Sequence, residues 1–194
     1  MFRGIQRDFA GNRGAAGFTL VELLVVILIA AILLGLGLPA LEKLVASNQV
    51  DTTCDAFVSS LNEARSEAAK FGGSATVSLT PGSGGADWGA SGWTMVVTMP
   101  DGTQNTLRKG APVPPGYTLV STYAGPVTFD STGRLAAGGV DGKFMLCQGG
   151  GPVAGGAARL ITVKATGRVR VAQNDASGNP INDLGGAETN CAAP

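Results

Sequence analysis

The sequence contains no histidine, which removes the residue that proteins most often use as a general base and as a zinc ligand. Cysteine is scarce, and Cys54, Cys147 and Cys191 are too far apart for a paired-cysteine metal motif. Charged residues make up 14% of the chain and cancel to a net charge of zero, which argues against a broadly basic nucleic-acid-binding surface. No G-x-S-x-G or S-x-x-K motif is present. The sequence therefore predicts a protein that is not an enzyme and needs no metal or cofactor.

Charge is missing most conspicuously from residues 17–41, GFTLVELLVVILIAAILLGLGLPAL. At about 1.5 Å per residue, a helix over residues 18–38 is long enough to cross the roughly 30 Å hydrocarbon core of a bilayer. Arg3, Arg7 and Arg13 precede this segment. By the positive-inside rule, the N-terminus stays in the cytoplasm and the C-terminal domain is exported.

The start of this segment does not fit a secretory signal, in which small residues follow the apolar core. Here the small residues, ending in Gly17, come before the apolar core, so a cut after Gly17 would leave the apolar segment on the mature protein. The segment also carries Glu22. An ionised carboxylate inside a bilayer costs at least about 2.5 kcal/mol, which implies a partner or a function. The alternative is that Glu22 lies at the headgroup boundary and extends its carboxylate to water.

The hexapeptide GFTLVE at residues 17–22, followed by an apolar run, resembles the prepilin signature of type IV pilins and type II secretion pseudopilins. The resemblance implies cleavage between Gly17 and Phe18 by a prepilin peptidase and N-methylation of Phe18. It also implies that Glu22 acts in filament assembly by meeting the N-terminal amine of a neighbouring subunit. The expected partners are the peptidase, other minor and major pilins or pseudopilins, the inner-membrane assembly platform and membrane lipid. The expected location is the bacterial inner membrane with a periplasmic head, and then the pilus or pseudopilus filament.

After the apolar segment, residues 40–71 have the pattern of an amphipathic helix that ends at Gly72 and Gly73. Apolar residues recur every three or four positions, which places them on one helix face: Leu41, Leu44, Val45, Cys54, Phe57, Val58, Leu61, Ala64 and Ala68. Pro39, together with Gly35 and Gly37, is expected to bend or loosen the helix.

Beyond residue 71 the pattern changes to short apolar runs between glycine- and proline-containing turns. The predicted strands are 74–79, 92–98, 105–108, 117–122, 127–130, 143–147, 159–164 and 168–172. The predicted fold is therefore α+β: a long N-terminal helix, membrane-spanning in its first half and amphipathic in its second, packed on an antiparallel β-rich head. The expected divisions are a cleaved cytoplasmic leader (1–17), a transmembrane and filament-core helix (18–39), an amphipathic helix (40–71), a head (72–172) and a C-terminal tail (173–194).

An exported head lies in an oxidising compartment, which favours a disulfide between Cys147 and Cys191. Free thiols are the alternative, because sequence alone does not fix which cysteines pair. Cys54 is predicted to be a small buried residue on the helix.

Four further stretches narrow the resemblance to the GspH/FimT group of minor pilins and pseudopilins. They are LNEARSEAAK at 61–70, the Gly92-Trp93 pair, FDSTGR at 129–134 and ITVKATGRVRV at 161–171. The late cysteine pair resembles FimT or FimU minor pilins more than the H pseudopilins. The resemblance implies a structural filament subunit, at the tip or in the initiation complex of a type IV pilus-like filament. The alternative is the minor pseudopilin H of type II secretion.

One basic motif suggests a further function. In a strand, Arg168 and Arg170 would project from one face while Val169 and Val171 face the core. Lys164 lies just before the turn and would extend the basic patch. In FimT proteins a G-R-x-R motif is associated with DNA binding during natural transformation, which is what the resemblance implies here. The alternative is an ordinary half-exposed strand.

Overall fold

The computed structural model describes residues 17–82, 88–136, 138–149 and 157–191. The chain divides into two compact units, residues 1–40 and 41–194, which are described separately below. Helix α1, Leu20–Phe71, contributes residues to both units. Apart from Gly17, the predicted leader lies outside the described residues.

In the first unit, α1 begins with an N-cap at Thr19. The Thr19 hydroxyl accepts a hydrogen bond of 3.2 Å from the Glu22 backbone N–H, which satisfies one of the free donors of the first helical turn. The helix runs through Gly35, Gly37 and Pro39, the positions predicted to loosen it. Every side chain from residue 18 to residue 38 is exposed, and the helix is long and apolar enough to cross a membrane by length and composition.

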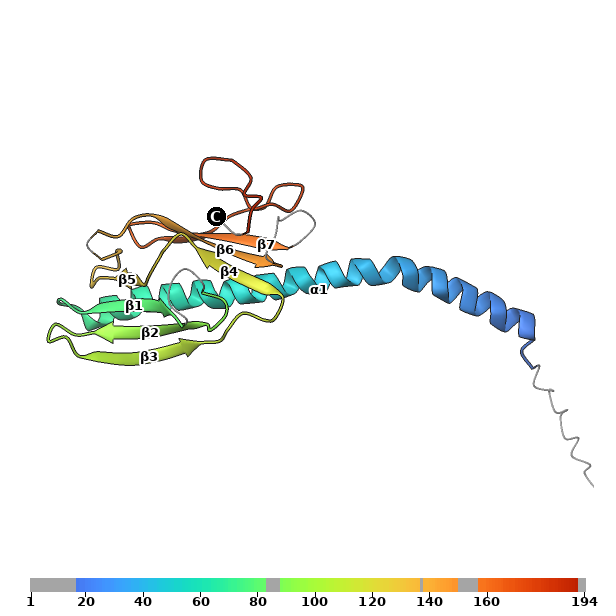
Figure 1. The fold of residues 1–194 in the computed structure, drawn as a ribbon, viewed down its shortest axis with the longest axis horizontal. Coiled ribbons are helices and arrows are strands. Elements are labelled where there is room, and N and C mark those ends of the chain that lie inside the picture. The colour runs from blue at the N-terminus through green and yellow to red at the C-terminus, as the bar shows by residue number, and fades with distance from the viewer. Residues whose placement is uncertain (1–16, 83–87, 137, 150–156, 192–194) are drawn as a thin grey trace, which may run out of the picture. The chain divides into compact units, whose positions relative to one another are not determined.

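The second unit contains two four-stranded antiparallel sheets (Figure 1). The first sheet has the order β3-β2-β1-β5, formed by β1 (Thr76–Pro81), β2 (Trp93–Thr98), β3 (Gln104–Gly110) and β5 (Val127–Phe129). The second sheet has the order β4-β6-β7-β8, formed by β4 (Tyr117–Ser121), β6 (Gly142–Gln148), β7 (Ala158–Val163) and β8 (Val169–Val171). Each predicted strand is present with shifted ends, so the predicted α+β fold is confirmed.

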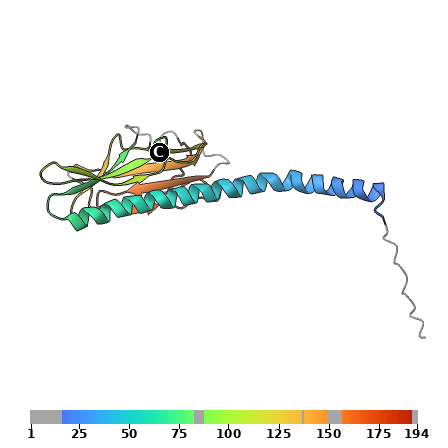
Figure 2. The same cartoon turned by 90° about the horizontal axis from the view of Figure 1, so that it is seen from below.

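The second half of α1 lies along the sheets and supplies one side of the core (Figures 1 and 2). Phe57, which is fully buried, makes edge-to-face contacts with Trp93 of the first sheet and Phe144 of the second. The ring centroids are 4.9 and 4.8 Å apart, respectively, within the range in which such pairs are attractive. This one side chain therefore joins the helix to both sheets.

The predicted apolar face of α1 is correct from Cys54 onward and wrong before it. Leu41, Leu44 and Val45 are exposed, with 55 to 59% of their surface accessible, and the buried positions are Ala46 and Val50 instead. Extending the buried stripe backwards from Cys54 at helical spacing leads to residues 50 and 46, which lie on a different face from residues 41, 44 and 45.

The C-terminal region covers the outer face of the second sheet. Cys191 is bonded to Cys147 of β6, with their Cα atoms 6.1 Å apart, and packs with Met145, Ala158 and Leu160 in a small second core. Cys54 is free and buried on α1, as predicted, and burial raises the pKa of its thiol to about 12. It is therefore a core residue that stays protonated at neutral pH.

Candidate functional site

The first candidate region is the start of α1, where Gly17, Phe18 and Glu22 lie. Phe18 is 76% exposed, and Glu22 stands in the first turn of the helix with its side chain exposed. Glu22 carries the one charge between residues 17 and 41. No cation among the described residues forms an ion pair with it. The first unit thus presents an apolar helix surface with a single uncompensated carboxylate near its N-terminal end.

The second candidate region contains two copies of a five-residue turn that recurs in the head. In each copy, the first residue's N–H donates to the fifth residue's carbonyl, and a glycine at the fourth position donates to the first residue's carbonyl. The copies are 99–103, 130–134, 164–168, 175–179 and 182–186. Their glycines have φ between 75° and 87°, as in hairpin turns that end with a left-handed residue. Two of these turns contain the same T-G-R tripeptide and therefore present Arg134 and Arg168 at equivalent positions.

These two T-G-R turns pack against each other. A Cβ atom added at Gly167 would lie 1.9 Å from the Gly133 carbonyl oxygen, so only a glycine permits this approach. Arg65 of α1 donates a 2.8 Å hydrogen bond from Nε to the same carbonyl, and Leu135 N donates 3.0 Å to the Ala165 carbonyl. The fold thereby gathers Arg65, Arg134 and Arg168 around one pair of turns.

Only part of the predicted basic patch is free of ion pairs. Arg168 is exposed, and no ion pair to it occurs among the residues that the structure describes. Arg170 Nη1 lies 3.5 Å from Asp183 Oδ1, and Lys164 Nζ lies 3.1 Å from Asp141 Oδ2. Lys164 also forms an ion pair with Asp183. The two aspartates therefore compensate the charges of Lys164 and Arg170.

The pKa values support this compensation. The hydrogen bonds that the Lys164 ammonium donates to Asp183 and then to Asp141 raise the pKa of Lys164 above its usual range. The same bond lowers the pKa of Asp183, and the Ala165 backbone N–H, followed by Lys164, lowers that of Asp141. All three groups are therefore charged at neutral pH, and the positive potential around Lys164 is small.

The orientation predicted for the two valines is half wrong. Val169 is half-buried and packs against the main core, whereas Val171 is 39% exposed. β8 is a three-residue strand at the edge of its sheet, so its C-terminal end, at Val171, extends beyond the core. Sequence reasoning also missed Arg65 and Arg134. The T-G-R tripeptide shared by 132–134 and 166–168 was a signal for Arg134, but Arg65 lies in a helix far away in the sequence.

Comparison with known protein families identifies the family of this chain. Residues 53–167 match the family described as Type II transport protein GspH, which covers more than half of the chain. The chain belongs to the GspH family. Residues 12–38 also match the prokaryotic N-terminal methylation motif, which implies processing by a prepilin peptidase and anchoring in the inner membrane before assembly. The protein is thus a prepilin-type structural subunit of the GspH family, and not an enzyme.

One solved structure is similar to this chain in its fold. The type IV minor pilin FimU from Pseudomonas aeruginosa, in space group P21, has a TM-score of 0.52 and 20% sequence identity. The match covers 74% of this GspH-family chain and 96% of FimU. The same protein in space group P65 has a TM-score of 0.48 and 20% identity, over 73% of this chain and 98% of that one. No curated protein sequence matches the chain significantly.

Proposed function

We propose that this protein is a minor subunit of a type IV pilus-like filament, placed at the tip or in the initiation complex. The observation that carries the proposal is the apolar surface of residues 18–38, all exposed, with Glu22 near its start. In a membrane, lipid covers such a surface, and in a filament the helices of neighbouring subunits replace the lipid. Each neighbour, once cleaved before Phe18, also supplies an α-amino cation as a counter-charge for Glu22.

The processing sites belong to this proposal. Cleavage between Gly17 and Phe18 removes the basic leader and creates the amine on Phe18, which is then methylated. The N-terminal methylation motif found at residues 12–38 spans both residues and supports this assignment. The periplasmic location of the head is consistent with the Cys147–Cys191 disulfide, since disulfides persist in oxidising compartments.

A type II secretion pseudopilin is the second candidate, favoured by the description of the matching family as a Type II transport protein. Deleting the gene separates the two. We expect loss of most surface pili, restored by a plasmid copy of the gene, while secretion of folded proteins stays unchanged. Pili are counted by electron microscopy and secreted proteins are assayed in the culture medium. Normal piliation with a secretion defect would instead assign the protein to the secretion machine.

DNA binding is a third candidate, and the structure changes which residues would carry it. Arg168, Arg134 and Arg65 are gathered around the paired turns, with no ion pairs to other described residues, whereas Lys164 and Arg170 are compensated by aspartates. Exposed arginines can contact successive phosphates and give salt-dependent binding without reading the bases.

A mobility-shift titration of the full-length protein in detergent tests this candidate. We expect Arg168→Gln to weaken binding and to reduce the slope of log affinity against log salt by about 1, because one phosphate contact is lost. Arg170→Gln is the matched control and should change binding less, since Asp183 already offsets that charge. Absence of any salt-sensitive binding by the unsubstituted protein would end the DNA hypothesis.

A further inference from the structure

The outer face of the second sheet carries a row of cations that crosses three neighbouring strands. Lys143 of β6 lies opposite Thr162 of β7, and Thr162 lies opposite Arg170 of β8. Opposite residues of antiparallel strands project to the same face, so Lys143 and Arg170 share that face. Lys164 follows the last residue of β7 and pairs with the same aspartate, Asp183, as Arg170. Lys164 therefore belongs to the same row.

The C-terminal region supplies a carboxylate for every cation of this row. Glu188 Oε1 lies 2.8 Å from Lys143 Nζ, and Asp183 forms ion pairs with both Lys164 and Arg170. The two carboxylates are themselves largely covered, with 18% of the Glu188 side chain and 31% of the Asp183 side chain accessible. One short segment of the chain thus neutralises a row that spans three strands.

Residues 173–191, which we call the C-terminal cover, are joined to the sheet through side chains. The backbone hydrogen bonds that the structure describes for residues 175–188 all close turns or loops within the cover itself. The links to the sheet are the ion pairs above, the disulfide between Cys191 and Cys147, and a 3.2 Å hydrogen bond from Asn174 Nδ2 to the Ala158 carbonyl. An external anion can therefore displace the carboxylates of the cover without breaking a strand pairing of the sheet.

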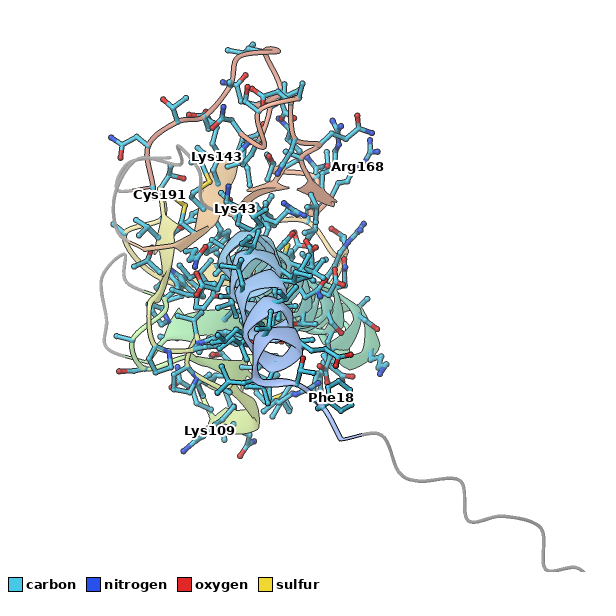
Figure 3. All side chains as sticks on the ribbon, turned by 90° about the vertical axis from the view of Figure 1, so that its right-hand side faces the viewer. Phe18, Lys43, Lys109, Lys143, Arg168 and Cys191 are labelled. Atoms are coloured by element: carbon cyan, nitrogen blue, oxygen red, sulfur yellow. A yellow bond between two sulfur atoms is a disulfide. The ribbon has the colours of Figure 1, made fainter. Side chains whose placement is uncertain are left out.

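A row of cations selects a ligand that carries a row of anions. Neighbouring strands are about 4.8 Å apart, so the row extends about 10 Å from β6 to β8. A single small anion is too short to contact both ends, whereas a nucleic-acid backbone presents successive phosphates along its length. Arg168 lies two residues before Arg170 and extends the row with an exposed cation. Figure 3 shows Lys143 and Arg168 on the side of α1 that carries the second sheet, and Lys109 of β3 on the opposite side.

We propose that the C-terminal cover is an autoinhibitory element that occupies a phosphate-binding row on the second sheet. Asp183 and Glu188 take the places of phosphates, and a nucleic-acid backbone has to displace them to reach Lys143, Lys164 and Arg170. The exposed Arg168 is available without this displacement. The inference rests on the DNA-binding candidate described above, to which it adds a second set of binding residues and the means by which they are blocked.

The test compares the unsubstituted full-length protein in detergent with Asp183→Asn/Glu188→Gln, by mobility-shift titration with a DNA duplex of random sequence. We expect the double variant to bind at least about tenfold more tightly, because charge-assisted contacts to phosphates become possible. The slope of log affinity against log salt should become steeper by about 2. Lys143 and Arg170 supply the two new contacts, while Lys164 keeps its ion pair with Asp141.

Glu42→Gln/Asp55→Asn is the matched control for the change in net charge. It also removes one glutamate and one aspartate, and both are exposed on α1 and in no ion pair with the residues that the structure describes. Because these carboxylates lie away from the row, the control should bind DNA within about twofold of the unsubstituted protein.

Arg170→Gln separates local unmasking from a general effect of charge, because its effect should depend on the background. In the unsubstituted protein it should change binding little, since Asp183 already offsets the charge. In the double variant it should weaken binding about tenfold, because Arg170 then contacts a phosphate. The single variant Asp183→Asn unmasks the same arginine and gives the same comparison if the double variant does not fold.

The outcomes distinguish the cover from the DNA-binding candidate. Equal affinities of the unsubstituted protein and the double variant, or equal effects of Arg170→Gln in both backgrounds, would overturn the cover and leave the DNA candidate standing. Equal tightening by the matched control would also overturn the cover. Absence of salt-sensitive binding by every one of these proteins would overturn both proposals. Displacement of the DNA by polyglutamate at equal charge concentration would assign the row to acidic proteins in place of nucleic acid.

Discussion

A Glu22→Val variant is expected to insert into the inner membrane normally and to be absent from sheared filaments. Valine makes the segment more apolar, so membrane insertion should not suffer. What is lost is the one charge between residues 17 and 41, and with it the ion pair that we assign to the Phe18 amine of a neighbour. In a low-dielectric helix bundle an unpaired amine is costly, so the loss should lower incorporation by far more than tenfold.

The measurement is the ratio of subunit in the sheared filament fraction to subunit in the membrane fraction, by immunoblot. Glu42→Gln is the matched control, because Glu42 is an exposed glutamate of the same helix that lies beyond the apolar segment. Glu22→Asp keeps the charge on a shorter side chain and should incorporate partially. Normal incorporation of Glu22→Val would show that Glu22 merely extends its carboxylate to water at the headgroup boundary.

The second large effect is expected at Gly167, where Gly167→Ala should destabilise the head by about 3 kcal/mol. Two costs combine: the backbone has φ of 77°, and the new Cβ would lie 1.9 Å from the Gly133 carbonyl oxygen. The two T-G-R turns would have to separate, which also removes the acceptor position that Arg65 uses.

Gly178→Ala is the control within the same protein, because Gly178 occupies the fourth position of the same kind of turn, at φ of 87° with open space around it. It should lose only the conformational cost, about 1 kcal/mol. Urea unfolding of the full-length protein in detergent, followed by tryptophan fluorescence, measures both. Trp88 and Trp93 are the two tryptophans of the chain and both are buried in the head. Equal destabilisation by the two variants would show that the turns do not depend on close contact.

Features that depend on neighbouring residues were predictable from the sequence. The long helix follows from an uninterrupted apolar run and then a three-four spacing, and the strands follow from short apolar runs between turn residues. The prepilin signature at Gly17 to Glu22 is likewise local, because it is a short motif of consecutive residues. The buried state of Cys54 also followed from its place on the helical stripe.

Tertiary structure decided which charges are free and which residues meet. Asp183 lies well beyond Lys164 and Arg170 in the sequence, yet the path of the C-terminal region brings it against both. Arg65 reaches the T-G-R turns from α1. Periodicity within a segment determines which face is apolar, but it does not determine which distant side chain lies opposite. The order of the local elements and the assembly signature were therefore determined by the sequence itself. The charge balance around Arg168 and the pairing of the two turns were determined only by the packing of distant segments.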